Sequence, residues 1–250
     1  MTLIPSQHPA TCRIAQSDAD VAACQALRHA CFLGTDGLDA DIFDASSDHV
    51  MIEQNGALVC TMRLRVLGEG VDLSATYTGQ YYAFDAIKAP ALEIGRFCTS
   101  AGPFSLDVLR MAWAVLLAYV DQYRIATLFG CTSFQGIDPM RYSDAFATLN
   151  THYISDIDVQ PRGADGLPLS QFASPDARSA HSFPQLSALQ ISYLKMGGRV
   201  SDHLIVDHGL NTLHVFLCLA VADIPAARVA SLRRMAAQTT GLHIPAPRNS

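Results

Sequence analysis

The sequence lacks a long uninterrupted apolar segment, although 50% of its 250 residues are hydrophobic. About 20 consecutive apolar residues are needed to cross a bilayer, and the apolar content here is spread over short segments. The first 13 residues include Pro5 and Pro9 and lack the charged start and apolar run of a secretory signal. We therefore expect a cytoplasmic protein with a sizeable core, no membrane-spanning helix, and a mature chain that begins close to Met1.

Lysine is scarce: only Lys88 and Lys195 occur among the 17 basic residues, against 23 acidic ones, and the net charge is −6. General affinity for nucleic acid depends on clustered cations that neutralise phosphates. We therefore expect no nucleic-acid partner. The excess of arginine over lysine has two explanations, codon usage, which we favour, and forked contacts with carboxylates or phosphates.

The sequence also lacks a CxxC pair, and its seven cysteines are widely spaced. This pattern is typical of reduced, buried thiols in a cytoplasmic protein and argues against structural zinc. His203, His208 and His214 lie close together with Asp202 and Asp207, but their spacing matches no common metal site. We expect no metal ion.

Several catalytic signatures are absent, namely GxSxG, the Walker loop, GxGxxG and HExxH. Their absence disfavours a serine hydrolase, a nucleotide-phosphate hydrolase and a dinucleotide-dependent oxidoreductase. The chemistry must therefore be sought in other combinations of residues.

Hydrophobic spacing and turn signals predict alternating helices and strands. Helices are expected over 17–33, from Ser105 to 123, from Asp138 to 149, over 185–196, and from Pro225 to 237. Strands are expected over 49–53, 58–66, 92–98, 125–131 and 213–221, with a type I′ turn at Asn55-Gly56 and a break at Gly102-Pro103. Residues 158–183 are expected to form a long loop or lid. The fold class is then α/β or α+β, with one domain over 1–250 and a mixed central sheet.

The expected strand 92–98 contains two charges, Glu93 and Arg96, in an apolar segment where an unpaired charge is costly. Alternation places them on opposite faces, unless a bulge near Gly95 brings them together. The structural interpretation is an ion pair between them, or pairs with Asp44 or Asp48.

A second group of charges lies upstream of this strand, at Arg28, Asp41, Asp44, Asp48 and Arg63. Alternating charges suit a zwitterionic amino acid, because its carboxylate binds arginine and its ammonium binds a carboxylate. The functional interpretation is therefore an amino-acid-binding site.

Four motifs stand in the order seen in acyl-homoserine-lactone synthases and the acyltransferases similar to them: ALRHACF (26–32), DIFDASSDH (41–49), TMRL (61–64) and EIGRF (93–97). Four downstream motifs are LRMAW (109–113), LFGCTSFQG (128–136), YLKMGGRVSDH (193–203) and NTLHVF (211–216). With them, the chain resembles the ornithine-lipid N-acyltransferases, sometimes called hemolysin-like, over residues 12–237.

The resemblance implies a GNAT-like fold with a mixed, mostly antiparallel sheet flanked by helices. It implies transfer of a 3-hydroxyacyl chain from acyl carrier protein to the α-amino group of an amino acid, which gives a lyso-aminolipid precursor. No cofactor is bound, since the donor is carried on the 4′-phosphopantetheine of the carrier. A second O-acyltransferase acts downstream. Ornithine is the first choice of acceptor; residues 183–185 and 33–40 depart from the family pattern and keep glutamine open. The residues also allow an acyl-homoserine-lactone synthase or a non-catalytic binding protein.

The expected site residues follow from the charges and the resemblance together. Glu93 is the expected general base, acting directly or through water, with a backbone N–H as oxyanion donor where the sheet splays. The expected substrate-binding residues are Arg28, Asp44, Asp48, Arg63, Arg96 and Ser133. Arg63 and Arg96 either bind the acceptor carboxylate or organise the acidic loop. Carrier docking is assigned to Arg110, Arg141, Lys195 and Arg199.

The final helix carries Arg228, Arg233 and Arg234. These residues allow two interpretations, a solvated face or peripheral contact with the inner face of the membrane. The sequence does not decide between them.

Overall fold

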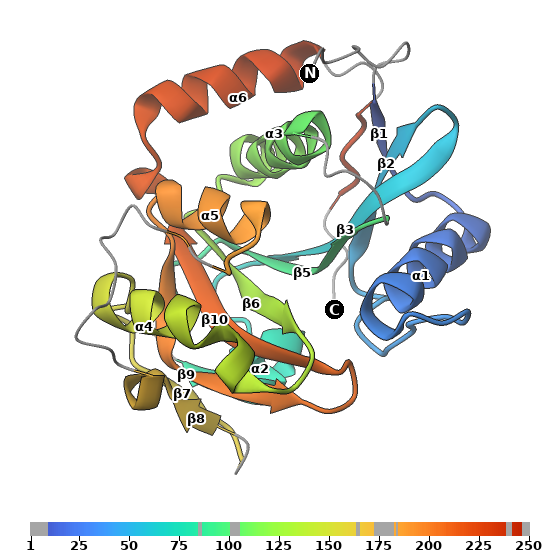
Figure 1. Ribbon diagram of the computed structural model, residues 1–250. Helices are drawn as coiled ribbons and strands as arrows, with labels where there is room; N and C mark the ends of the chain where they lie inside the picture. Colours follow the sequence, from blue (N-terminus) through green and yellow to red (C-terminus); the bar gives the residue numbers. More distant parts are fainter. Residues whose placement is uncertain are drawn as a thin grey trace, which may run out of the picture. The chain divides into compact units, whose positions relative to one another are not determined.

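The structure is a computed structural model that describes residues 10–84, 87–100, 106–163, 166–172, 183, 185–238 and 242–246. Figure 1 shows the helices and strands of the chain, which divides into two compact units. The first unit comprises Met1–Arg65, Arg96–Gln122 and Val229–Ser250, and the second comprises Val66–Gly95 and Tyr123–Arg228. The expected single domain over 1–250 stays a prediction.

Three antiparallel strands form the sheet of the first unit: β1 (Thr11–Ile14), β2 (Asp48–Gln54) and β3 (Ala57–Leu67). Helix α1 (Asp18–Leu33) packs on these strands through Cys24, which is buried with Met51. Ser17 caps α1 by accepting a hydrogen bond from the Asp20 N–H. The helix expected over 17–33 is confirmed, and so is the hairpin, because Asn55 and Gly56 both have positive φ, 55° and 78°.

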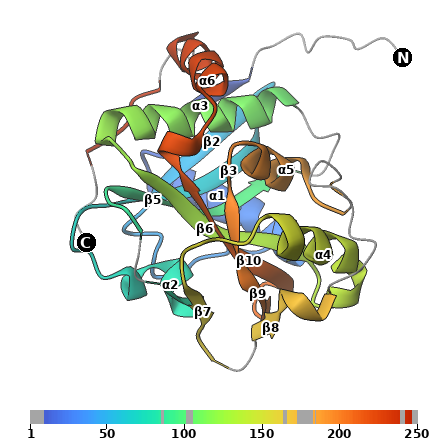
Figure 2. The ribbon, with the colours of Figure 1, turned by 90° about the vertical axis from the view of Figure 1, so that its left-hand side faces the viewer.

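Helix α3 (Leu106–Tyr123) also belongs mostly to the first unit. Apolar residues at spacings of three and four along this helix predict one core-facing stripe, and Leu109, Trp113, Leu116 and Val120 are buried, whereas Leu106 at the start of the stripe is 59% exposed. Helix α6 (Ala226–Gln238) runs beside α3 in Figures 1 and 2, and Arg233 of α6 pairs with Asp121 of α3. The expected cap Ser105 and the break at Gly102-Pro103 lie outside the described residues.

The sheet of the second unit is mixed. Strand β5 (Ala91–Thr99), whose residues up to Gly95 belong to this unit, pairs in parallel with β6 (Thr127–Gln135). The ladders from β6 to β10 (Thr212–Ala220), β9 (Arg199–Asp207) and β8 (Gly166–Pro168) are all antiparallel. Figure 2 shows β6, β10 and β9 side by side. The expected mixed, mostly antiparallel sheet is confirmed.

The remaining elements of the second unit are short. Strands β4 (Tyr82–Phe84) and β7 (Val159–Pro161) pair with each other. The helical elements are η1 (Leu73–Ala75), α2 (Tyr77–Tyr81), η2 (Pro139–Tyr142), α4 (Ser143–His152), η3 (Leu169–Phe172), α5 (Ala188–Lys195) and η4 (Val221–Asp223). The core is aromatic, with Tyr82, Phe84, Phe129 and Phe216 packed together.

One expectation for this unit is wrong in part, and one strand was not predicted. Residues 158–183 are not one loop, because they contain β7, β8 and η3; residues 173–182 lie outside the described part. Strand β9 was not expected, because its sequence RVSDHLIVD mixes charged and apolar residues without strict alternation. Its pairing with β10, a buried and mostly apolar strand, supplies the order that its own pattern does not.

Gly130 of β6 permits a close backbone approach within the second unit. A Cβ atom at this position would clash with the carbonyl oxygen of Ile94 in β5, a backbone atom that no rotamer change can move. We therefore expect Gly130→Ala to lower the free energy of unfolding by about 2 kcal/mol, measured by urea denaturation. Gly68→Ala is the control, because open space surrounds Gly68. Equal stability of the two variants would contradict the close approach.

Candidate active site

Three arginines and three aspartates of the first unit form a closed ring of ion pairs. The loop 34–47 between α1 and β2 supplies the aspartates, while α1, β3 and β5 each supply one arginine. The six contacts are Arg28–Asp39 at 3.0 Å, Asp39–Arg96 at 2.7 Å, Arg96–Asp41 at 3.1 Å, Asp41–Arg63 at 2.5 Å, Arg63–Asp44 at 2.9 Å and Asp44–Arg28 at 3.0 Å. Each guanidinium thus faces two carboxylates, and each carboxylate faces two guanidiniums.

The ring is largely buried and electrically neutral. The Arg28 side chain is fully buried, and only Asp41, at 21% exposure, is more than a tenth exposed. Isolated buried charges are costly, but mutual pairing and hydrogen bonding offset that cost. The ring therefore fixes the loop 34–47 against the helix and both strands.

Further polar groups complete the ring around Asp44. Gln25 donates to its carboxylate at 2.8 Å, and the buried His49 ring lies against its backbone carbonyl at 3.2 Å. Burial raises the pKa of Asp44, but the Arg28, Arg63 and Gln25 contacts together outweigh burial and lower that pKa below its usual range. Burial lowers the pKa of His49, which favours the neutral imidazole.

The ring corrects the expected partners of Arg96. Arg96 pairs with Asp39 and Asp41. Its backbone is left-handed, with φ 53°, next to the Gly95 where a distortion was expected. Asp39 was missed, although its spacing of two residues from Asp41 in an acidic loop was the available signal.

Asp48 and Ser133, the other expected substrate-binding residues, are not among the six residues of the ring. Asp48 is buried and accepts a hydrogen bond from the Tyr119 hydroxyl at 2.9 Å, within the first unit. Ser133 belongs to the second unit, where its side chain is exposed and its carbonyl accepts from Gln190 at 3.2 Å. Of the expected substrate-binding residues, the structure therefore brings Arg28, Asp44, Arg63 and Arg96 together in the ring.

Glu93 lies on β5 in the second unit and is 6% exposed. Its Oε1 accepts a hydrogen bond from the backbone N–H of Thr78 at 2.7 Å, at the start of α2. The parallel ladder between β5 and β6 ends at the pair Glu93–Phe129, although both strands continue. Glu93 is thus a buried carboxylate at the point where parallel pairing stops.

The four expected carrier-docking residues are all exposed. Arg110 of the first unit pairs with Asp107 at 3.0 Å. In the second unit, Arg141 stacks on Tyr142, Lys195 lies 5.4 Å from the centre of the Phe183 ring, and Arg199 donates to the His152 carbonyl at 2.9 Å. These contacts leave the cationic groups on the surface.

Within the described residues, no group of three or more His, Cys, Asp or Glu side chains is arranged to hold a metal ion. His203 pairs with Asp202 at 2.6 Å, whereas His214 is buried beside Tyr82. None of the seven cysteines, all of which lie in the described part of the chain, forms a disulfide. None of the helices in the described ranges has the length and apolar character needed to cross a membrane.

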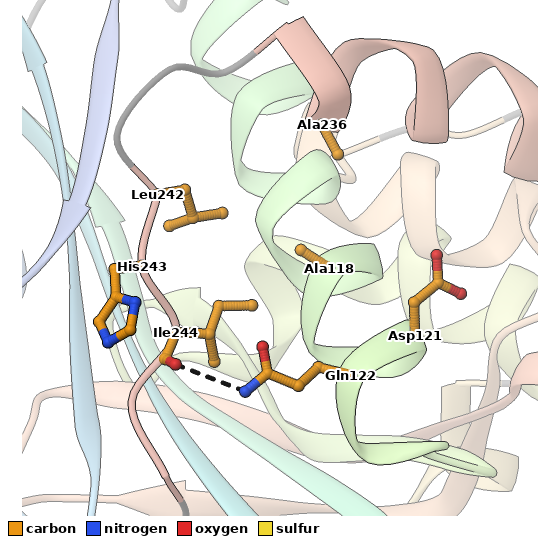
Figure 3. Close-up of a pocket in the computed structure, with 7 residues that line it drawn as sticks. All are labelled: Ala118, Asp121, Gln122, Ala236, Leu242, His243 and Ile244. Atoms are coloured by element: carbon orange, nitrogen blue, oxygen red, sulfur yellow. Dashed lines mark hydrogen bonds between the residues drawn. The ribbon is translucent and has the colours of Figure 1, made fainter.

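A cavity of about 650 Å³ lies in the first unit (Figure 3). Its lining residues come from α3, α6 and the segment that follows α6: Ala118, Asp121, Gln122, Ala236, Leu242, His243 and Ile244. Gln122 donates to the Ile244 carbonyl at 3.4 Å. None of the expected site residues lines this cavity, so it is not the candidate site.

Comparison with known proteins identifies the class of fold. Residues 23–114 match the model of the acetyltransferase (GNAT) domain. The crystal structure of BjaI, a CoA-dependent acyl-homoserine lactone synthase, aligns with a TM-score of 0.52 at 11% identity, over 96% of this chain and 95% of that chain. The protein therefore has a GNAT-like α/β fold, as expected.

Two curated relatives share a more specific name. The L-ornithine N(alpha)-acyltransferase of Rhodobacter capsulatus is 27% identical over 234 residues, covering 83% of this chain and 88% of the relative. The protein of the same name from Brucella abortus is 24% identical, covering 85% of this chain and 84% of the relative. The resemblance inferred from the motifs is confirmed along most of the chain.

The ring generates a stability prediction. Asp44→Asn removes one charge and leaves Arg28 and Arg63 with one carboxylate fewer, so we expect the free energy of unfolding at pH 7 to fall by about 3 kcal/mol. Urea denaturation measures the change. Asp36→Asn, an exposed position on the same loop, is the control and should change stability by less than about 0.5 kcal/mol.

The same ring predicts a pH dependence. Because the folded pKa of Asp44 is lowered, its stabilising contribution is complete above the unfolded pKa of about 3.9 and is lost as pH falls toward the folded value. The stability difference between wild type and Asp44→Asn should therefore be constant from pH 5 to 7 and narrow below about pH 4. Unfolding curves at each pH measure it, and a difference that widens on acidification would refute the assignment.

Proposed function

We propose that this protein is an N-acyltransferase that transfers a 3-hydroxyacyl chain from acyl carrier protein to the α-amino group of an amino acid, with ornithine as the first choice. The product is a lyso-aminolipid precursor. The names of the curated relatives and the GNAT-like fold support this proposal. The observation that carries it is Glu93, a buried carboxylate where the β5–β6 ladder ends.

Glu93 is suited to activate the acceptor. An ammonium group has no lone pair and cannot attack, so a base must first remove a proton. Glu93, directly or through a water molecule, takes this proton, and the amine then attacks the thioester carbon. A carbon–nitrogen bond forms, the carbon–sulfur bond breaks, and the carrier thiol leaves with a proton. A backbone N–H near the end of the ladder stabilises the oxyanion between these steps.

The arginine–aspartate ring has a supporting role in this proposal. Arg63 and Arg96 were expected either to bind the acceptor carboxylate or to organise the acidic loop. Each of them already contacts two aspartates, which supports the second role. We therefore propose that Arg28, Asp44, Arg63 and Arg96 act by fixing the conformation of the loop 34–47 within the first unit.

The donor is proposed to be an acyl chain on the 4′-phosphopantetheine of the carrier, with no bound cofactor. Arg110, Arg141, Lys195 and Arg199 are exposed cations suited to an acidic carrier protein. Mutating them should affect the KM for the carrier and its salt dependence more than the chemical step.

We propose that the enzyme acts in the cytoplasm. We also propose that a separate O-acyltransferase consumes its product. Peripheral membrane contact through α6 is less supported than it was from the sequence, because Arg233 pairs with Asp121 in two hydrogen bonds, at 3.0 and 2.6 Å. Arg228 and Arg234 are exposed.

One experiment tests the function. The purified protein is incubated with 3-hydroxyacyl carrier protein and a mixture of amino acids that includes ornithine and glutamine, and mass spectrometry identifies the acylated product. A parallel reaction with adenosylmethionine tests for lactone synthesis. Acylation of no acceptor at all would overturn the proposal.

Glu93→Gln tests the role of the base. Glutamine retains an oxygen that accepts from the Thr78 N–H, so the fold should persist, while kcat falls by about 100-fold or more because the base is lost. Single-turnover rates of acyl transfer measure the effect, and circular dichroism checks the fold. Glu69→Gln, an exposed position, is the control; unchanged activity in Glu93→Gln would exclude Glu93 as the base.

A further inference from the structure

Two buried carboxylates in the second unit lack the cationic partners that those of the ring possess. Glu93 is 6% exposed and Asp207 is 5% exposed. Both accept hydrogen bonds, but neither forms an ion pair with a residue in the described part of the chain. A buried carboxylate without a cation is costly, and a cationic ligand would remove that cost.

Asp207, the last residue of β9, has surroundings suited to an ammonium group. Its Oδ1 accepts from the Leu210 N–H at 3.0 Å, which caps the β9–β10 turn. Its Oδ2 faces the hydroxyls of Tyr77 at 3.4 Å and Tyr81 at 3.3 Å, longer than the usual 2.7–2.8 Å of such bonds. The two tyrosine rings lie 5.3 Å apart. A buried carboxylate held only by neutral donors keeps its full negative charge and attracts a cation through that charge.

Two buried hydroxyls beside these carboxylates have no hydrogen-bond partner. Thr78 and Thr212 are each 1% exposed, and the Oγ1 atom of each is unsatisfied. The Thr78 backbone binds Glu93, and Thr212 lies directly opposite Asp207 in the β9–β10 ladder, on the same face of the sheet. Unsatisfied buried hydroxyls are rare in folded proteins, and an ammonium donor would satisfy these two.

Helix α2 connects the two carboxylates. Its five residues supply the Thr78 N–H to Glu93 and the hydroxyls of Tyr77 and Tyr81 to Asp207. If Glu93 receives a proton from the α-ammonium, as proposed above, Asp207 is the other buried carboxylate that α2 contacts and is left to pair with a second ammonium group.

We propose that Asp207, with Tyr77, Tyr81 and Thr212, binds the side-chain ammonium of the acceptor and selects a diamino acid over glutamine. This inference rests on the proposed N-acyltransferase function and deepens it. A neutral side chain leaves the buried carboxylate uncompensated, and sites built around a buried polar partner reject analogues that lack the matching group.

Asp207→Asn tests the inference. Asparagine keeps the oxygen that accepts from Leu210 but loses the charge. We compare L-ornithine with L-norvaline, which has the same carbon chain without the terminal amine. The ratio of kcat/KM for ornithine over norvaline should fall by about 100-fold, through a higher KM for ornithine. Norvaline acylation should change by less than about threefold. Asp202→Asn, exposed on the same strand, is the control and should preserve the ratio.

Thr212→Val provides a second variant. Valine matches threonine in shape and removes the unsatisfied hydroxyl, so the free protein should become no less stable. If the hydroxyl binds the ligand, L-ornithine binding measured by calorimetry should nevertheless weaken about fivefold. A purely structural hydroxyl would leave ornithine binding unchanged.

The outcomes separate this inference from the proposed function. An unchanged ornithine preference in Asp207→Asn, or a wild type that acylates norvaline and ornithine equally, overturns the cation site while leaving the acyltransferase intact. If wild type acylates no amino acid, the proposed function fails, and the inference fails with it. Reduced ornithine selectivity in both variants, with norvaline acylation retained, supports the site.

Discussion

The closed ring of Arg28, Arg63 and Arg96 with three aspartates is the interaction on which the first unit depends. Each charge contacts two charges of opposite sign, so the ring buries six charged groups with no net charge. The loop 34–47 has little secondary structure of its own. Its conformation is therefore set by the ring, which joins it to α1, β3 and β5.

Two buried carboxylates of the second unit have different hydrogen-bond partners from those of the ring. Glu93 and Asp207 are held by neutral donors, the Thr78 and Leu210 N–H groups and two tyrosine hydroxyls. Neutral donors orient a carboxylate but leave its charge in place, whereas the guanidiniums of the ring cancel it. Charge compensation in the first unit suits a rigid support, whereas the neutral donors around Glu93 and Asp207 fit our proposal that the second unit recognises a cationic substrate. Shape and chemistry are thus assigned to different parts of the chain.

Local patterns predicted the elements that local forces specify. The Ser17 cap and the 3.6-residue spacing of α1, the stripe of α3 and the Asn55-Gly56 turn are all short-range features, and the structure confirms them. Strand β9 and the pair β4–β7 were missed, because their order comes from partners distant in sequence. A strand with mixed polarity gives no periodic signal until its neighbours decide which face is buried.

For the candidate site, too, the sequence predicted some features and the tertiary structure was needed for the others. The sequence by itself placed Glu93 and Arg96 in an apolar strand, where charges need compensation, and singled out Arg28, Asp44 and Arg63 as a second group of charges upstream. Only the tertiary structure decided which arginine or hydrogen-bond donor faces which carboxylate. It placed Asp39 in the ring, directed Asp48 to Tyr119, and left Asp207 facing two tyrosines. Ion pairs depend on distances of a few ångströms between groups far apart in sequence, and spacing along the chain does not contain those distances.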